Sequence, residues 1–444
     1  MKSEFMPYHF SKQHGIKLPR RSFLGHASLS ASVLTFGVTA PGVLCEAASL
    51  AKEDRILVVV EMAGGNDGLN TVIPHRDDLY RAARPKIAIG SSDVLAINDE
   101  LGLHPAMRGM ADLLENGQLS IVQGVGYENP NRSHFESMDI WHSCYRKDET
   151  RQDGWIGRYL ESEGMASLTD PPALHLGKRQ QPFALMSRGV RVPSIQSLEQ
   201  FRLRVADSPD IRNAIRSLSN QSREDATDLL GFVQASSRNA LEASERMESA
   251  GVKYKPSESY PETALGRQLE TVAKLIASGL HTRVYYVRID GFDTHANQPD
   301  AHAVLLRTVG DAVSTLVRDV NAQGDGDRLL VMCFSEFGRR VAENASDGTD
   351  HGAAGPVFLA GNGLKSGAVG KHPPLDDLQN GDLLHGVDFR QVYAAVLKDW
   401  FLGKVRDTLN EKVTMFDIAN AKAERVGGRR LVYPVHVGRN FGVG

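Results

Sequence analysis

Residues 56–70 read ILVVVEMAGGNDGLN, and this stretch decides the fold. Its first five residues are aliphatic and include three valines, which is typical of a strand buried on both faces of a parallel sheet. The strand runs into Gly64 and Gly65, which permit positive φ and close approach of other backbone. Asp67 follows at once. The sequence therefore predicts a carboxylate at the edge of a buried sheet.

Three more apolar runs are predicted as strands, at residues 119–127, 283–290 and 328–338. Between the last two, apolar residues recur at helical spacing across residues 302–320. Strand, helix and strand in this order form a βαβ unit. Together with the first two strands, this unit predicts a mainly parallel sheet with helices on both faces.

The composition is that of a large globular protein. The chain has 444 residues, of which 41% are hydrophobic and 24% charged, and a formal net charge of −3. We expect one large domain with insertions, or one with a cap, and no nucleic-acid partner. Helical runs in residues 166–279 predict a cap or helical insertion. Residues 403–444 form a C-terminal tail with some strand character and no predicted function.

The first 50 residues have the order of an export signal. Arg20 and Arg21 precede a charge-free, weakly apolar stretch over residues 27–44, and a zone of small residues follows. This order is typical of a twin-arginine signal peptide, so we expect recognition by the twin-arginine export machinery and a periplasmic or secreted protein. Because that route carries folded proteins, it suits a chain that folds or acquires a metal before export.

A membrane anchor and a lipoprotein are the competing interpretations of this segment. Its serine, threonine, glycine and proline residues make the stretch too polar to prefer lipid, so no stable membrane anchor is expected. Leu44 is larger than the small residue that normally precedes a lipidated cysteine, which argues against lipidation of Cys45. Cleavage would leave Cys144 and Cys333, and the sequence does not decide whether they pair.

Ligand-type side chains follow several of the predicted strands. Asp67 follows the first, Asp293 and His295 the third and Glu336 the fourth, and His351 lies in a glycine-rich loop further on. In an open α/β sheet, ligands bind where the carboxyl ends of parallel strands meet. Carboxylates and imidazoles are donors for a divalent cation such as Zn²⁺, Mn²⁺, Mg²⁺ or Ca²⁺. We therefore predict a site for one or two ions.

Each of these side chains also has a structural alternative when it is taken alone. A strand-end aspartate is often a helix N-cap or a turn residue, and His295 fits an exposed imidazole. Glu336 has Arg339 and Arg340 nearby in the sequence as ion-pair partners. A shared cation explains all the side chains together, because several buried acids without partners are costly.

Six short motifs follow one another along the chain. They read GGNDGLN, NRSHFES, GFDTHANQ, SEFGR, GTDHG and DFRQVY. In this order, behind a twin-arginine start, they resemble the bacterial domain-of-unknown-function family 1501, which is assigned to the alkaline-phosphatase and sulfatase-like superfamily. The resemblance implies an α/β domain over residues 51–402. This domain would be an alkaline-phosphatase-like three-layer sandwich with a mainly parallel sheet.

The resemblance also implies how the metal ligands divide. Carried across residue by residue, it assigns one ion to Asp293, His295 and His351 and a second ion to Asp67 and Glu336.

One departure from the superfamily pattern affects the number of ligands. The superfamily commonly has an adjacent Asp-His pair where this chain has Glu336 and Phe337, so one expected ligand is absent. His302, at the start of the following helix, is a candidate replacement. The choice between one ion and two therefore stays open.

The implied nucleophile is Ser133, which would bridge the ions from the N-terminus of a helix. The helix dipole and a neighbouring cation would both make its hydroxyl more acidic. Arg132, beside it, would hold an anionic substrate in a fork of donors. His134 is the alternative catalytic residue, and a plain helix N-cap is the structural alternative for Ser133.

These inferences predict an exported metal-dependent hydrolase of the alkaline-phosphatase or sulfatase type, acting on a phosphate or sulfate ester. An exported pseudoenzyme or binding protein with the same fold is the main alternative. An SGNH-type serine esterase is a second alternative, because GGND resembles its oxyanion block and Asp382 and His385 form a late Asp-x-x-His. Such esterases have a Gly-Asp-Ser block upstream, which is absent between residues 51 and 63.

Overall fold

The computed structural model describes most of the chain between residues 55 and 409. The described residues are 55–146, 148–165, 170–178, 180–196, 213, 217, 254–403 and 405–409. The chain divides into two units, 1–52 and 53–444, and all described residues belong to the second. The predicted signal peptide, most of the tail and much of the predicted insertion therefore lie outside them. No helix among the described residues is long and apolar enough to cross a membrane.

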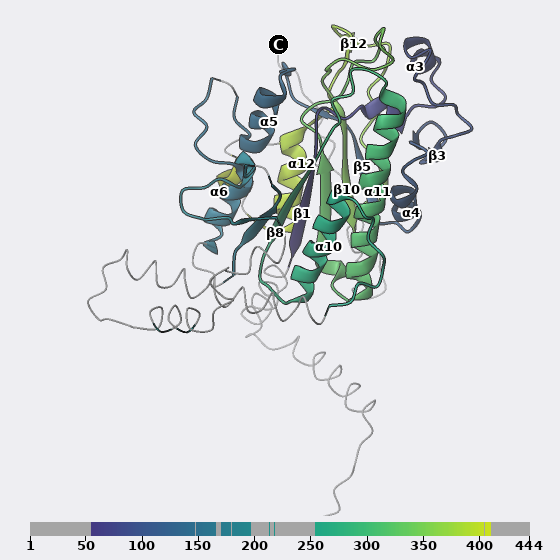
Figure 1. The fold of residues 1–444 in the computed structure, drawn as a ribbon. Coiled ribbons are helices and arrows are strands. Elements are labelled where there is room, and N and C mark those ends of the chain that lie inside the picture. The colour runs from purple at the N-terminus through teal and green to yellow at the C-terminus, as the bar shows by residue number, and fades with distance from the viewer. Residues whose placement is uncertain are drawn as a thin grey trace, which may run out of the picture. The chain divides into compact units, whose positions relative to one another are not determined.

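A mainly parallel sheet forms the centre of this unit (Figure 1). In the part of the chain that the structure describes it has nine strands, and β14 (Val387–Asp388) pairs beside β5. The other eight lie in the order β11 (Gly367–Val369), β5 (Leu119–Gly126), β10 (Gly355–Gly361), β9 (Leu329–Phe334), β1 (Ile56–Ala63), β8 (Val284–Asp290), β6 (Ala173–Leu176) and β7 (Ser194–Ile195). Of these described strands only β10 runs antiparallel to its neighbours. The predicted α/β class with a mainly parallel sheet is confirmed.

Side chains alternate along the strands and so divide the core in two. On β1, Ile56, Val58 and Val60 belong to one cluster of buried side chains, while Leu57 and Val59 belong to another. All eight residues of this strand are buried. Because both faces of the sheet are apolar, both must be covered by helices.

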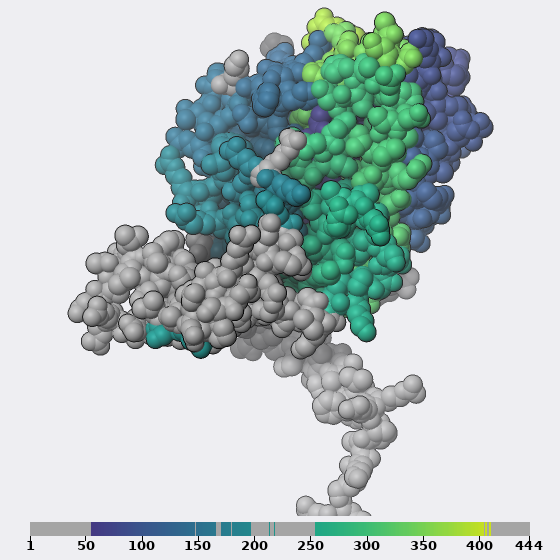
Figure 2. All heavy atoms as spheres, viewed as in Figure 1, coloured from purple at the N-terminus to yellow at the C-terminus, as the bar shows by residue number. Residues whose placement is uncertain are grey.

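Helices cover both clusters and complete a three-layer sandwich. The first cluster includes side chains of α4 (Arg108–Glu115), α10 (Ala264–Ala277) and α11 (Gln298–Ala322). The second includes side chains of α5 (His134–Ser143), α6 (Trp155–Ser162), α12 (Phe389–Ala395) and its π-helical continuation η7 (Val396–Trp400). α13 (Val405–Leu409) contacts α6. In Figure 2, green α11 lies between the indigo segment of α3 and α4 and the blue segment around α5.

The predicted elements differ from the observed ones by a few residues. The strand predicted at 328–338 is shorter, because β9 ends at Phe334 and Glu336 lies beyond it. The helix predicted at 302–320 is longer, because α11 begins at Gln298 after Asn297, whose φ is 47°. Ser133 is the N-cap residue of α5, as the helix-start pattern indicates.

Short elements surround the sandwich. They are η2 (Gly68–Asn70), α3 (Asp78–Ala83), η4 (Phe183–Leu185) and η6 (Gly326–Arg328), a small sheet of β2 (Val72–Ile73), β4 (Gly102–Leu103) and β3 (Leu95–Ala96), and a hairpin of β12 (Leu378–Gln379) and β13 (Asp382–Leu383). β6, β7 and α10 fall within residues 166–279, where a cap or helical insertion is expected. For the residues of this range that the structure does not describe, the cap or insertion stays a prediction. Cys144 and Cys333 are both buried, and no disulfide bond joins them.

The ends of β1, β8 and β9 lie side by side. β1 pairs in parallel with both neighbours, so that Ala63 is opposite Asp290 and Glu61 is opposite Phe334. Gly64 comes next with a φ of 120°, and a Cβ at this position would lie 2.4 Å from the amide nitrogen of Asp293. The absence of a side chain at Gly64 therefore lets the segments after β1 and β8 meet.

We expect Gly64→Ala to lower the free energy of unfolding by roughly 3 kcal/mol or more, because it combines backbone strain with overpacking. The matched control is Gly279→Ala, where φ is 72° and a Cβ would have no neighbouring atom within 4 Å. The control should lose about 1–2 kcal/mol from strain alone. Urea unfolding followed by circular dichroism measures both variants. Equal losses would contradict the close approach at Gly64.

Candidate metal centre

A group of ligand-type side chains lies past the carboxyl ends of β1, β8 and β9. His134 is the first residue of α5, Asp293 follows β8, and His351 lies in the loop before β10. One ligand atom from each of the three lies within 4.8 Å of the others. Among the described residues this is the only such group of three or more His, Cys, Asp or Glu side chains.

Three imidazoles direct their Nε2 atoms toward one oxygen, Oδ1 of Asp293. The Nε2 to Oδ1 distances are 3.0 Å for His295, 3.1 Å for His351 and 3.4 Å for His134. The Nε2 atoms of His295 and His351 are 2.9 Å apart. Such separations between donor atoms suit ligands that bind one cation at about 2.0–2.2 Å each.

The second nitrogen of each imidazole contacts an oxygen. The Nδ1 contacts are His134 to Oε1 of Glu336 at 2.8 Å, His295 to Oδ1 of Asp350 at 3.3 Å and His351 to the carbonyl oxygen of Arg132 at 2.8 Å. Carboxylate and carbonyl oxygens only accept hydrogen bonds, so Nδ1 donates in each case. When such a ring is neutral, donation through Nδ1 leaves the lone pair of Nε2 available to a metal, as in histidine ligands of metals.

The arrangement fits a cation better than it fits hydrogen bonding alone. Hydrogen bonds account for two of the rings, because Nε2 of His351 contacts Oδ1 of Asp293 and Nε2 of His295. The Nε2 of His134 is buried and has no hydrogen-bond partner among the described residues. Two imidazoles and one carboxylate form a donor set that suits a divalent cation of borderline hardness. His134, His351 and Asp293 are therefore the residues that fit a metal, and His295 lies beside them with its Nε2 2.9 Å from that of His351.

Arg339 holds Asp293 from the other side. Its buried guanidinium donates to Oδ1 of Asp293 at 2.7 Å and to the carbonyl oxygens of Gly65, Thr349 and Phe292 at 2.6, 2.8 and 2.9 Å. Partial burial opposes ionisation of Asp293, but the hydrogen bonds from Arg339 and His351 outweigh it and lower its pKa to about 2. The carboxylate therefore stays charged at neutral pH. From the sequence, Arg339 is expected only as a partner of Glu336.

Glu336 supports the centre from behind His134. Besides the contact to Nδ1, its Oε1 accepts from the amide of Gly64 at 2.9 Å, and its Oε2 accepts from the hydroxyl of Ser335 at 3.0 Å. The hydrogen bond with Glu336, opposed by partial burial, raises the pKa of His134. Glu336, predicted as a direct ligand, thus contacts a ligand histidine, and it fixes the orientation of that ring.

Ser133 and Arg132 lie at the rim of this group. Ser133 is exposed, and its side chain caps no amide of α5. Its amide donates to Oδ1 of Asn131 at 2.8 Å. The guanidinium of Arg132, expected to hold a substrate anion, is bonded through Nε to Oδ2 of Asp382 at 3.0 Å. Its fork of donors is therefore engaged in an ion pair within the protein.

Asp67, predicted as a metal ligand, has its carboxylate contacts elsewhere. Its Oδ2 accepts from Nη1 of Arg84 at 2.6 Å, and the side chains of both residues are fully buried. Nε2 of Gln298 donates to the same oxygen at 2.5 Å. Burial opposes ionisation, but Arg84 outweighs it and the pKa of Asp67 is lowered. Oδ1 is buried without a hydrogen-bond partner among the described residues. The counter-ion of Asp67 in this structure is an arginine.

Two other residues named from the sequence take different places. His302, the candidate replacement ligand, is buried with its Nε2 2.9 Å from Oδ1 of Asn66. Phe337, which replaces the usual histidine, packs its ring 4.9 Å from that of His134 and 5.0 Å from that of His351. The apolar ring therefore forms a wall of the centre in place of a ligand.

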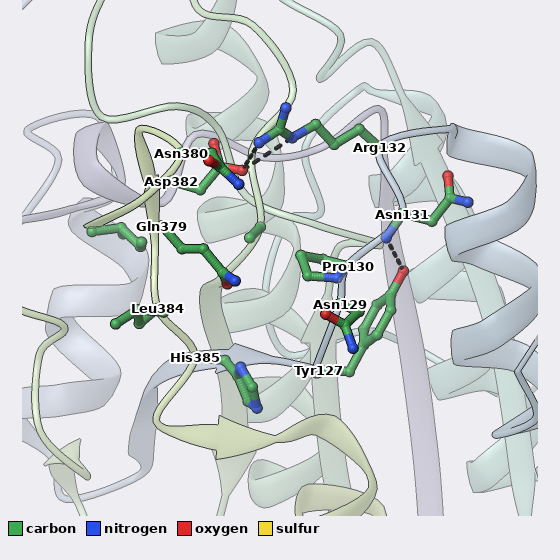
Figure 3. Close-up of a pocket in the computed structure, with 12 residues that line it drawn as sticks. Tyr127, Asn129, Pro130, Asn131, Arg132, Gln379, Asn380, Asp382, Leu384 and His385 are labelled. Atoms are coloured by element: carbon green, nitrogen blue, oxygen red, sulfur yellow. Dashed lines mark hydrogen bonds and ion pairs between the residues drawn. The ribbon is translucent and has the colours of Figure 1, made fainter. Parts of the chain in front are cut away.

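A pocket of about 520 Å³ lies next to the metal centre. One wall is formed by residues 127–132 and the other by residues 379–385 of the hairpin segment (Figure 3). Arg132 belongs to both places, because its side chain lines the pocket while its carbonyl oxygen accepts from His351. Ala353, two residues after His351, also lines the pocket. The centre and the pocket are thus neighbours.

Comparison with known proteins relates the chain to one family and to several solved structures. A family model described as "Protein of unknown function (DUF1501)" matches residues 54–402. No curated protein matches the chain.

The similar solved structures include three bacterial proteins. A sulfatase from Pseudoalteromonas sp. is 10% identical with a TM-score of 0.34, covering 78% of this chain and 67% of that one. The alkaline phosphatase of the Antarctic bacterium TAB5 is 11% identical with a TM-score of 0.32, covering 70% and 92%. The C-terminal periplasmic domain of EptC from Escherichia coli is 8% identical with a TM-score of 0.35, covering 82% and 89%. Scores at this level do not establish a shared reaction.

We expect metal content to depend on the imidazoles of the centre. His295→Ala and His351→Ala should each lower the bound metal measured by elemental analysis, because each removes an Nε2 donor next to Asp293. A chelator should lower the melting temperature of the parent and have less effect on either variant. His281→Ala is the control, since that imidazole contacts Asp170 and belongs to a different site. A parent protein that binds no divalent metal at all would contradict the assignment.

Asp67→Asn should separate a structural carboxylate from a metal ligand. The substitution leaves the buried guanidinium of Arg84 without its counter-charge, and we expect a loss of roughly 3–5 kcal/mol in the free energy of unfolding. Metal content of the folded variant should equal that of the parent. Asp293→Asn should give the opposite pattern, with most of the metal lost. If Asp67→Asn also loses the metal, Asp67 binds an ion as the strand-end pattern predicts.

Proposed function

The chain belongs to the DUF1501 family, and we propose that it is an exported metal-dependent hydrolase of phosphate or sulfate esters. The observation that carries this proposal is the convergence of three Nε2 atoms on Oδ1 of Asp293. When bound there, a divalent cation would act as a Lewis acid toward a phosphoryl or sulfuryl oxygen. Imidazole donors favour Zn²⁺ over Mn²⁺, Mg²⁺ or Ca²⁺, which prefer oxygen ligands.

The protein's own residues would arrange the reaction around this group. Arg339 keeps Asp293 ionised and aimed at the three imidazoles. Glu336 and Asp350 fix the rings of His134 and His295 through their Nδ1 atoms. Such fixed orientations allow stabilisation of developing charge without reorganisation during the reaction. With a divalent cation bound, this arrangement would attract an anionic ester oxygen.

Ser133 is our proposed nucleophile. It stands at the N-terminus of the ten-residue helix α5, directly before the ligand His134, and its hydroxyl caps no amide of that helix. The positive end of the helix dipole favours a developing alkoxide at this position. In the proposed step the hydroxyl oxygen attacks phosphorus or sulfur, the bond to the alcohol oxygen breaks, and the alcohol leaves with a proton. Water then releases the anion.

One observation favours the alternative of a binding protein with the same fold. Arg132, the expected clamp for the substrate anion, is engaged with the carboxylate of Asp382. To bind the substrate anion, Arg132 would have to exchange Asp382 for the ester group. Otherwise Arg132 would only line the pocket. Export through the twin-arginine machinery to the periplasm remains a prediction from residues 1–50.

Ser133→Ala tests the proposed function and the nucleophile together. We expect it to abolish hydrolysis of p-nitrophenyl phosphate and p-nitrophenyl sulfate by the metal-loaded protein, while metal content stays at the parent level. Ser143→Ala, on the last turn of the same helix, is the matched control. Full activity of Ser133→Ala would transfer the role to His134 or to water. A parent protein that retains its metal and hydrolyses no ester of a broader panel would favour the binding-protein alternative.

A further inference from the structure

Half of the residues that line the pocket beside the metal centre have polar side chains without a charge. Amide side chains come from both walls, with Asn129 on one and Gln379 and Asn380 on the other (Figure 3). His385 adds an imidazole at the lower end of the pocket in this view, while the hydroxyl of Tyr127 is bonded to the backbone amide of Asn131. Each amide offers two N–H donors and one oxygen acceptor. Donors and acceptors are thus interspersed on both sides of the cavity.

The two charged groups of the pocket lining neutralise each other. Arg132 and Asp382 form an ion pair across the top of the pocket in Figure 3, where dashed lines join them. The carboxylate of Asp382 is nearly fully buried, and its Oδ1 lies 3.9 Å from Nε of Arg340. The charges at this end of the pocket are therefore engaged within the protein, and the neutral side chains are left to contact a ligand.

A ligand that matches this lining has many hydroxyl groups and no charge. A hydroxyl both donates and accepts, so it can bond to either end of an amide and to a carboxylate oxygen. An apolar ligand would leave these polar groups unpaired, which is costly. The volume of about 520 Å³ lies within the range of roughly 300–1,000 Å³ that small-molecule sites have.

We propose that this pocket binds the uncharged, hydroxyl-rich part of the substrate, a saccharide, while its anionic ester group lies at the metal centre. The inference rests on the proposed function for the ester end. The pocket and the metal centre are close along the chain. Arg132 of the pocket directly precedes Ser133 and His134, and Ala353 of the pocket lies two residues after His351. A saccharide in the pocket would therefore hold its ester next to Ser133.

Binding of neutral sugars to the chelated protein tests the pocket independently of catalysis. Lactose, maltose and myo-inositol are the probes, measured by saturation-transfer NMR and titration on the full chain with a chelator present. We expect at least one to bind with a millimolar Kd. Gln379→Ala and Asn380→Gly should weaken that binding roughly 2- to 10-fold each, the effect of one lost hydrogen bond. Asn380 has a φ of 55°, so glycine retains its backbone conformation.

Leu378→Ala is the matched control. It lies next to Gln379 on β12 and is exposed, but it does not line the pocket, since neighbouring strand residues face opposite sides. Its Kd should equal that of the parent. Absence of binding by all three probes at concentrations up to about 50 mM, or equal Kd values in Gln379→Ala and Leu378→Ala, would overturn the proposal.

Kinetics separate failure of this inference from failure of the proposed function. With glucose 6-phosphate and glucose 6-sulfate as substrates, Gln379→Ala should raise KM with kcat unchanged, and it should leave both constants unchanged for p-nitrophenyl phosphate. Ester hydrolysis without this difference in KM supports the function and overturns the saccharide pocket. Sugar binding without hydrolysis of any ester supports the pocket and overturns the hydrolase.

Discussion

Arg339 joins the ends of neighbouring strands through one buried guanidinium. It donates to carbonyl oxygens of Gly64 and Gly65 after β1, to that of Phe292 after β8 and to that of Thr349 before β10. A buried cation is stable only if its donors all have acceptors, so these loops are tied to its position. Arg339 also donates to Oδ1 of Asp293, which is the oxygen on which the imidazoles converge. The geometry of the whole centre therefore depends on one arginine.

The strands and their ends could be predicted because the strand residues are buried, and buried positions are occupied by apolar residues in a regular pattern. The aliphatic run of β1 and the helical spacing of α11 both follow from apolar contact with the core, which single-sequence patterns record well. The placement of Asp293 and His295 at one edge follows from the parallel direction of the strands, and His351 reaches the same edge from the loop before β10. These three are brought together as the strand-end pattern predicts.

Side-chain partners could not be predicted in the same way. Asp67 and Asp293 both follow buried strands, but Asp67 meets Arg84 from the irregular segment after α3, and no periodicity records that contact. Ser133 and His134 are adjacent at a helix start, and only the direction in which α5 leaves the sheet decides which side chain points inward. The pocket depends on the hairpin β12–β13 meeting residues 127–132, a tertiary contact without a local signal.

The donors of the metal centre come from distant parts of the chain. His134 precedes Asp293 by 159 residues (293 − 134), and His351 follows after another helix and strand. A partly folded chain therefore cannot assemble this donor set, because large loops must close first. An ion at this centre would be captured only after the central sheet is complete, and its capture would stabilise only the finished topology. Bound metal would then measure, in moles of ion per mole of chain, how much of a protein preparation has reached the native fold.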